Sequence, residues 1–143
     1  MTFGMCIFPS MMSEASTGPV PGSPVPASAI ERLTLIAGNV VKANGGVPPA
    51  RVSVVVTTRE EALASTNGGR VFSGEQTIVY LVTMEGRFVA RRAPRPPRAK
   101  APTGSYLSIV INAETFEGMD FGLSPDPPPV APASLGPVSY LTW

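Results

Sequence analysis

The sequence predicts an α+β domain in which one main N-terminal helix packs on a small antiparallel sheet of about four strands, with Pro-rich tails. The first observation is a helical spacing of apolar residues near the start of the chain. The second is a series of short β-branched or alternating segments after it, at 51–57, 77–84, 106–112 and 118–122. The third is the set of glycine- and asparagine-rich breaks between these segments. Together they predict a helix, a strand, a short helix and then an antiparallel meander.

The chain length sets the domain organisation. A chain of 143 residues holds one domain, or one domain with tails. Closely spaced prolines near the start favour an extended, solvated backbone, so we expect residues 1–27 to form a flexible segment. The α+β domain is expected at 28–124. A second Pro-rich segment follows at 125–143, and we expect it to dock on the domain.

The main helix is expected over 29–43. Its apolar positions at three- and four-residue intervals are Ile30, Leu33, Ala37, Val40 and Val41. Ser28 and Glu31 have the spacing of a capping box, which predicts a helix start at this point. The Asn-Gly-Gly sequence at 44–46 supplies a left-handed exit, and the two prolines that follow prevent continuation.

A strand and a second, short helix come next. The β-branched sequence RVSVVVT at 51–57 favours a strand. Thr58 and Glu61 repeat the capping-box spacing, which predicts a helix over 59–65. A second Asn-Gly-Gly sequence, at 67–69, is expected to end it.

Residues 77–84 form the most apolar run of the chain. Alternation would place Ile78, Tyr80, Val82 and Met84 on one face and Val79, Leu81 and Thr83 on the other. Because both faces are apolar, we expect a central strand covered on both sides. Glu85 and Gly86 suggest a bulge or tight turn before a short extension at 87–89.

The last strands of the meander are expected at 106–112 and 118–122, with a turn at 113–117 between them. In the first of these, Leu107, Ile109 and Ile111 alternate with polar neighbours and are expected to face the core. The end of the chain keeps large apolar groups after its prolines, which a disordered tail rarely does. We expect about the last eight residues to dock over the second face of the sheet. A homodimer through that face is the alternative.

The missing residue types exclude several chemistries. The chain has no histidine and one cysteine, Cys6, so a zinc site built on Cys and His is excluded. A Ser-His-Asp triad, a Cys-His pair and a His-ligated haem are excluded for the same reason. No internal disulfide can form. We expect no cofactor.

Charge and hydropathy limit the partners. The net charge of +1 gives no reason to expect a nucleic-acid partner. No uninterrupted apolar run is long enough to predict a membrane span.

A cluster of positive charge is the first candidate site. It consists of Arg91, Arg92, Arg95, Arg98 and Lys100, in a loop stiffened by prolines. One interpretation is an anion-binding arm for phosphate-rich polymers, acidic cell-surface glycans or anionic lipid headgroups. Another is a proline-rich ligand of an aromatic-lined module. The simplest is a long, mobile hairpin connection kept soluble by charge.

The second candidate is a set of turn carboxylates, which could act as acid and base if two of them met in a cleft. They are Glu85, Glu114, Glu117 and Asp120. Carboxylates at turns are ordinarily solvated, so we expect no enzyme activity from them.

Three segments resemble small uncharacterised exported or cell-envelope proteins of actinobacteria: VYLVTMEGRFV at 79–89, YLSIVINAETFEGMDFGLS at 106–124, and ASLGPV at 133–138. The stretch 112–118 also resembles the D-A-x-T-G turn of PepSY-like helix-plus-hairpin units. It differs in having Asn112 in place of Asp, and Phe-Glu before the glycine. The resemblance implies a non-catalytic module outside the membrane.

These observations lead to a non-enzymatic, extracytoplasmic binding or modulatory module that engages a macromolecular partner or an anionic surface. The start of the chain lacks a basic region and is a poor signal peptide as written, so a longer leader is one hypothesis for export. The alternative function is a structural or assembly protein that oligomerises through the sheet face.

Overall fold

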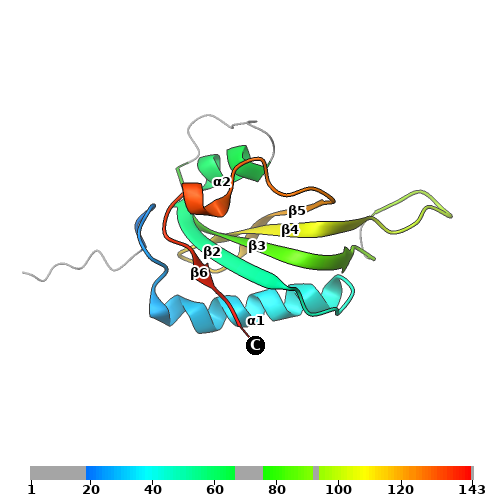
Figure 1. The fold of residues 1–143 in the computed structure, drawn as a ribbon, viewed down its shortest axis with the longest axis horizontal. Helices are drawn as coiled ribbons and strands as arrows, with labels where there is room; N and C mark the ends of the chain where they lie inside the picture. The colour runs from blue at the N-terminus through cyan, green and yellow to red at the C-terminus, as the bar shows by residue number, and fades with distance from the viewer. Residues whose placement is uncertain (1–18, 67–75, 92–93, 143) are drawn as a thin grey trace, which may run out of the picture.

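The computed structural model describes residues 19–66, 76–91 and 94–142 (Figure 1). The elements in chain order are α1 (Ala27–Ala43), β2 (Arg51–Thr58), α2 (Arg59–Thr66), β3 (Ile78–Val89), β4 (Thr103–Asn112), β5 (Gly118–Ser124), the 3₁₀ helix η2 (Pro132–Ser134) and β6 (Ser139–Tyr140). The strands form one antiparallel sheet in the order β5-β4-β3-β2-β6. The α+β class is confirmed, but the sheet has five strands rather than about four.

The additional strand is β6. It pairs with the outer edge of β2, with Ser53 opposite Tyr140 and Val54 opposite Ser139. Its two residues are too short to give a periodic signal, and they follow six prolines that oppose a strand. The last of these prolines is Pro137, so the residues of β6 keep the backbone N–H groups that pairing requires.

One face of the sheet packs on α1, which lies below the sheet in Figure 1. The helix buries Ala29, Leu33, Ala37 and Val41. Ile30 and Val40 are partly buried against the same core, so the predicted apolar face is confirmed. The sheet residues facing α1 include Tyr80, Val82, Met84, Leu107, Ile109 and Ile111, as the alternation predicts.

The start of α1 differs from the prediction. The helix begins at Ala27, its N-cap residue is Pro26, and no side chain caps it. Ser28 therefore lies inside the first turn and does not form the expected capping box with Glu31. The Ala29 N–H donates to the Pro26 carbonyl at 2.9 Å, so the first turn already forms ahead of Ser28 and Pro26 takes the N-cap position.

The Pro-rich residues just before α1 also pack on the domain. Val25 is buried in the core that α1 shares with the sheet. The Gly22 N–H donates to the Val56 carbonyl at 3.0 Å. Within residues 19–26, burial therefore holds Val25 and a backbone hydrogen bond holds Gly22, in contrast to the expected flexible segment. Residues 1–18 of that segment lie outside the described residues.

The predicted end of α1 and the predicted start of α2 agree with the structure. Gly45 and Gly46 have φ values of +111° and +73°, which confirms the left-handed exit from α1. At the start of α2, the Glu61 N–H donates to Thr58 Oγ1 at 3.3 Å. The Glu61 carboxylate does not complete the capping box but accepts from Thr57 Oγ1 at 2.9 Å. The expected exit at 67–69 lies outside the described residues.

The second face of the sheet carries a smaller core. Val55, Val79, Leu81 and Val110 pack there with Ala62 of α2. Leu135 and Val138 of the C-terminal segment, residues 125–142, cover part of the same cluster, and η2 lies on the side of the sheet away from α1 (Figure 1). β3 is therefore a central strand buried on both faces, as predicted.

The C-terminal segment crosses the edge of β2 from one face to the other. Val138 belongs to the second-face cluster, whereas Leu141 is buried in the α1-side core. The Leu141 N–H donates to the Val52 carbonyl at 2.9 Å. The end of the described chain therefore docks as an edge strand, and it contributes to both cores rather than to the second face alone.

The β3–β4 pair contains the expected irregularity. Its register shifts between Glu85 and Phe88, which confirms the bulge. Beyond it the two strands continue to the pair Val89 and Thr103, so this hairpin is longer than the predicted segments.

Candidate functional site

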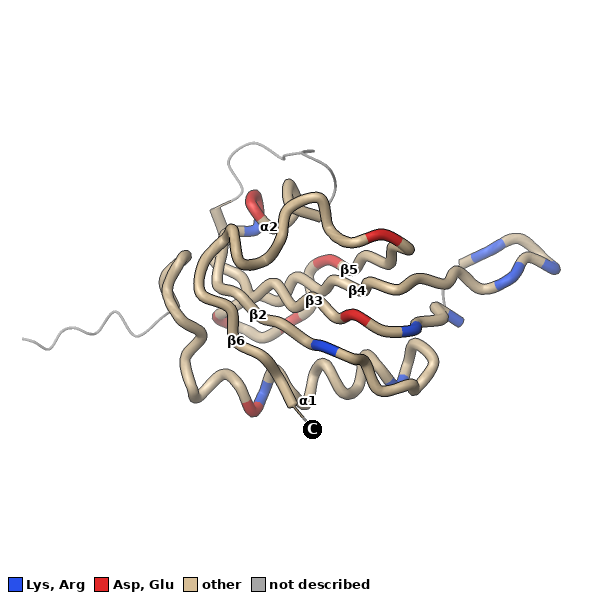
Figure 2. The backbone as a smooth tube through the Cα atoms, in the orientation of Figure 1, with Lys and Arg blue, Asp and Glu red and all other residues tan. Residues whose placement is uncertain are grey.

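The hairpin connection between β3 and β4, residues 90–102, extends from the end of the sheet and is called the basic arm below (Figure 2). At its base the Ala90 N–H donates to the Pro102 carbonyl at 2.8 Å. Arg91 and residues 94–100 are exposed. Arg95, Arg98 and Lys100 therefore lie on one projecting loop together with Arg91, whereas Arg92 lies outside the described residues.

The tip of the arm is a defined turn. The Ala99 N–H donates to the Pro96 carbonyl at 3.1 Å, and Arg98 has a φ of +69°. Pro97 at the second position and a positive φ at the third are the features of a type II turn. That third position normally favours glycine, so Arg98 holds a conformation that costs on the order of 1 kcal/mol.

A further contact orders the arm behind its tip. Arg95 Nη1 donates to the Arg91 carbonyl at 2.9 Å, so one guanidinium folds back on the backbone. The stretch 86–113 contains six of the 11 Lys and Arg residues and no Asp or Glu. The arm is thus a region of uncompensated positive charge in a chain whose net charge is only +1.

The structure does not bring the four candidate carboxylates together. Glu114 and Glu117 are exposed in the β4–β5 turn. Asp120 is paired with Arg59: Arg59 Nε donates to Asp120 Oδ2 at 2.8 Å and Nη2 donates to Oδ1 at 3.1 Å. Glu85 lies near the opposite end of the sheet. Glu85 pairs with Tyr106 of β4, whereas Asp120 pairs with Val110, four residues further along the same strand. The two carboxylates are therefore separated along the strand direction by a distance on the order of 13 Å.

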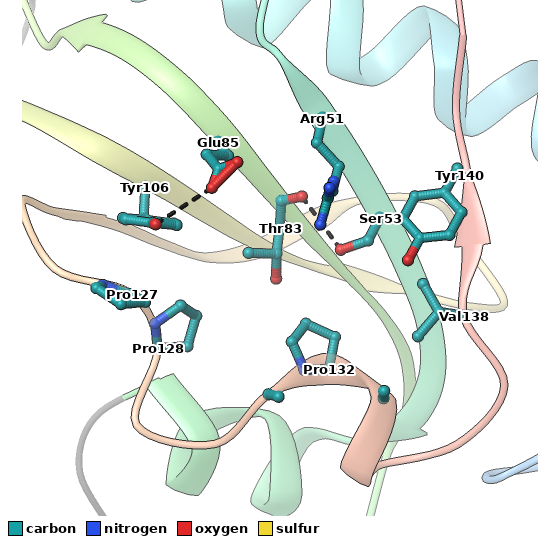
Figure 3. Close-up of a pocket in the computed structure, with 12 residues that line it drawn as sticks. Arg51, Ser53, Thr83, Glu85, Tyr106, Pro127, Pro128, Pro132, Val138 and Tyr140 are labelled. Carbon is teal, nitrogen blue, oxygen red and sulfur yellow. Dashed lines mark hydrogen bonds between the residues drawn. The ribbon is translucent and has the colours of Figure 1, made fainter.

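A pocket that the sequence reasoning missed lies between the second sheet face and the C-terminal segment (Figure 3). Its cavity volume is about 340 Å³. The sheet side is formed by Arg51, Ser53, Thr83, Glu85, Tyr106 and Tyr140, and the opposite side by Pro127, Pro128, Ala131, Pro132, Ala133 and Val138. We call it the proline-lined pocket.

Strand register arranges the polar side chains of this pocket in two rows. Arg51, Glu85 and Tyr106 lie opposite one another on β2, β3 and β4. Ser53 and Thr83 form the next row toward the second-face core. Tyr106 Oη donates to Glu85 Oε2 at 3.2 Å, which closes one end of the first row (Figure 3).

The second row contains an unusual hydroxyl. Ser53 Oγ donates to the Thr83 carbonyl at 3.3 Å, and both residues are buried, at 7% and 8% exposure. Among the described residues, Thr83 Oγ1 is a buried side-chain oxygen without a hydrogen-bond partner. Such a group costs about 1–3 kcal/mol unless it finds one.

The pocket also perturbs a phenol. Burial raises the pKa of Tyr106 above its ordinary value, and the hydrogen bond to Glu85 and the charge of that carboxylate raise it further. The nearby Arg51 acts in the opposite direction. The raised pKa keeps the phenol of Tyr106 protonated, so that it can donate its hydrogen bond to the Glu85 carboxylate.

A sequence signal for this pocket exists in β2 and β3. Valines and a leucine fill the second-face positions at Val55, Val79 and Leu81, and then the pattern changes to Ser53 and Thr83. Apolar residues give way to hydroxyl residues at paired positions of two neighbouring strands. Such a change indicates where the apolar, covered part of a sheet face ends and a polar part begins.

Comparisons with known proteins add no assignment: no family model matches the chain, and neither curated proteins nor solved structures give a significant match. In the part of the chain that the structure describes, no helix has the length and apolar character needed to cross a bilayer. The described residues also contain no group of three or more Cys, Asp or Glu side chains placed to hold a metal ion.

Proposed function

We propose that this protein is a non-enzymatic binding module that attaches to an anionic macromolecular surface through its basic arm. The observation that carries the proposal is the projection of Arg91, Arg95, Arg98 and Lys100 from the domain on a loop without acidic residues. Positive charge concentrated on an exposed extension attracts polyanions and speeds encounter with them.

The backbone of the arm supports a role for its side chains. Arg98 occupies a turn position that glycine would hold without strain. A non-glycine residue kept in this conformation at the tip of a charged loop points to a use for that side chain. The proline at the preceding position limits the conformations of the turn, so less ordering is needed on binding.

The chemistry of the arm favours acidic glycans or anionic headgroups over nucleic acids. No aromatic residue lies between Phe88 and Tyr106, so the arm offers no aromatic ring on which a base could stack. Guanidinium groups bind carboxylate, sulfate and phosphate oxygens with paired hydrogen bonds. We propose an acidic glycan as the partner.

The test is retention of the full chain on an immobilised sulfated glycan, with vesicles containing anionic phospholipid as the second arm. Replacing Arg91, Arg95, Arg98 and Lys100 with Ser should abolish retention at about 0.15 M salt, where exposed charges still act at short range. Salt should weaken binding of the unmodified protein. Equal retention of the two proteins would refute the proposal, and binding to the vesicles alone would replace the glycan by a lipid surface.

A matched pair of single variants controls for net charge. Arg98→Ser and Lys42→Ser each remove one exposed positive charge, the first from the arm tip and the second from the end of α1. Only Arg98→Ser should reduce retention clearly. If both variants reduce it equally, the attraction belongs to the whole molecule and not to the arm.

We further propose that the module acts outside the cytoplasm, in the cell envelope or secreted. The resemblance to exported actinobacterial proteins and to PepSY-like units supports this location, as does the expected glycan partner. Fractionation of cells that produce the protein with its natural upstream reading frame tests it. Recovery in the cytosol alone would contradict it.

The second candidate function is assembly. The sheet face that could have served it is occupied, because Val79 and Leu81 are buried under the chain's own α2 and C-terminal segment. The edge strand β5 offers another route, since it carries Phe121 at 53% exposure. Light scattering at high concentration separates the two functions: a strict monomer excludes assembly.

A further inference from the structure

The proline-lined pocket has the composition of a ligand site rather than of a packing defect. Its floor is polar, with a guanidinium, a carboxylate and the hydroxyls of Ser53 and Thr83. Its opposite wall is apolar, formed mainly by proline rings and Val138. A cavity of about 340 Å³ falls at the lower end of the range for small-molecule sites.

Thr83 gives an independent indication of a ligand. Its side-chain oxygen is buried and has no partner among the described residues, although Ser53 lies directly opposite on β2. The Ser53 hydroxyl instead donates to the Thr83 backbone carbonyl. Figure 3 shows the Thr83 hydroxyl directed into the cavity. A bound molecule with a hydroxyl or amide at this point would satisfy it.

The charges in the pocket define the charge of the ligand. Arg51 and Glu85 stand opposite each other on β2 and β3. Glu85 would repel an anion that Arg51 attracts, and Arg51 would repel a cation that Glu85 attracts. A ligand without net charge that both donates and accepts hydrogen bonds is compatible with this pair.

The walls define its shape. Tyr106 and Tyr140 present rings on the sheet side, and Pro127, Pro128 and Pro132 present rings on the other side. A flat ligand with partly apolar faces and hydrogen-bonding edges would fit between these two sets of rings. A purely apolar ligand would leave the hydroxyls of the floor unpaired, and this costs affinity.

We propose that the proline-lined pocket binds a neutral saccharide of one or two rings, with a sugar hydroxyl on Thr83 Oγ1 and the edge of the ring on Glu85 and Arg51. This site is separate from the basic arm. It would give the module a second, neutral specificity beside its attraction to anionic surfaces.

The experiment is a ¹H–¹⁵N chemical-shift titration of the full chain. The neutral probes are glucose, N-acetylglucosamine and maltose, and the charged counterparts are glucuronate and glucosamine. At least one neutral probe should cause saturable shifts at residues 51–53, 83–85 and 127–140, in about the millimolar range expected for so small a ligand. Glucuronate and glucosamine should bind more weakly at these residues than that neutral probe does.

Shifts at 94–100 alone would report the arm and not the pocket. The absence of pocket shifts with every neutral probe at 100 mM overturns the proposal. Tighter binding of glucuronate or glucosamine at the pocket residues overturns it as well, because the ligand would then not be neutral.

Thr83→Val tests the hydroxyl that carries the argument. The substitution keeps the shape of the side chain and removes the unpaired oxygen. Affinity for the binding saccharide should fall at least tenfold, while the melting temperature should stay the same or rise by about 2–5 °C. Unchanged affinity in a folded variant overturns the assignment of Thr83.

Thr57→Val is the matched control. Thr57 lies on the same face of the sheet at the other end of β2 and is fully buried, but its hydroxyl donates to Glu61. This variant should lower the melting temperature and leave saccharide affinity unchanged. Equal loss of affinity in both variants would mean that the effect is structural, which overturns the proposal.

Discussion

Tyr106 and Glu85 show how two residues can link the pocket to the stability of the sheet. The phenol donates to the carboxylate at 3.2 Å, and burial with this contact raises the pKa of Tyr106. The folded state therefore favours the protonated phenol. Its contribution to the free energy of unfolding is complete below the ordinary value of 10.0 and is lost as the pH rises through the raised pKa.

Glu85→Gln should lower the pKa of Tyr106, because the variant removes the negative charge that opposes ionisation, although burial still holds the pKa above its ordinary value. Tyr80 should titrate as before, since burial alone raises its pKa. Absorbance of tyrosinate at 295 nm between pH 9 and 12, compared with Tyr106→Phe to assign the steps, measures both groups. An unchanged titration of Tyr106 would show that the Glu85 contact does not form.

Asp120 explains why a candidate catalytic residue is structural in this fold. Its carboxylate accepts two hydrogen bonds from Arg59 and thereby connects the edge strand β5 to the start of α2. Both side chains are 27% exposed. A paired geometry of this kind is stronger than an ordinary surface ion pair.

Asp120→Asn should lower the free energy of unfolding by about 0.5–1.5 kcal/mol, and the loss should shrink in 1 M salt. Asp126→Asn is the control, because Asp126 is exposed and its backbone N–H, not its carboxylate, makes the local contact with Ser124. Urea unfolding of the three proteins measures the difference. Equal stability of the two variants would show that the pair with Arg59 contributes nothing.

At the scale of the elements, the basic arm and the sheet differ in how much of their side chains is exposed to solvent. Arg91 and residues 94–100 of the arm are exposed, whereas β3 is buried on both faces. The proposed binding role of the arm can therefore be tested separately from the stability of the sheet.

Replacing Arg91, Arg92, Arg95 and Arg98 with Ser should change the melting temperature by less than about 2 °C, because solvated charges contribute little to stability. Differential scanning calorimetry measures this. A decrease of many degrees would mean that the arm packs against the domain, and the binding test above would then need variants that keep the fold.

The elements that could be predicted are those whose secondary structure follows from the spacing of apolar residues within their own sequence. α1 is fixed by the spacing of Leu33, Ala37 and Val41, and β3 by apolar residues on both faces. The start of α1 could not be predicted from Ser28, because the first turn is closed by a backbone hydrogen bond from Ala29 to the Pro26 carbonyl and uses no side-chain cap.

The basic arm could be located from sequence because it depends on composition alone. The proline-lined pocket could not, because its floor and its opposite wall come from distant parts of the chain. Ser53 and Thr83 are ordinary strand residues until the C-terminal segment covers them. β6 escaped prediction for the same reason: two residues become a strand only where the edge of β2 receives them.

At the scale of the whole molecule, the C-terminal segment holds the two cores together. Leu141 is 6% exposed on the α1 side, while Leu135 and Val138 pack on the second face. The same segment forms one wall of the pocket. Stability of the domain and integrity of the site therefore depend on the same few residues.

Leu141→Ala should lower the free energy of unfolding by about 2–4 kcal/mol, as expected for a buried leucine at the edge of a core. Thr142→Ala, at the exposed neighbouring position, should have an effect below about 0.5 kcal/mol. Urea unfolding monitored by circular dichroism measures both. Equal stability of the two variants would show that the C-terminal segment does not complete the core.

The pairing of β6 with β2 has a consequence for how the chain reaches its native state. Ser53 and Tyr140 are 87 residues apart in the sequence, so loop-closure entropy delays this contact relative to the hairpins. Until this contact forms, the valine-rich strand β2 exposes an unpaired edge with which another copy can pair. The yield of native protein after dilution from denaturant should therefore decline as protein concentration rises, although β6 pairs with this edge in the native state.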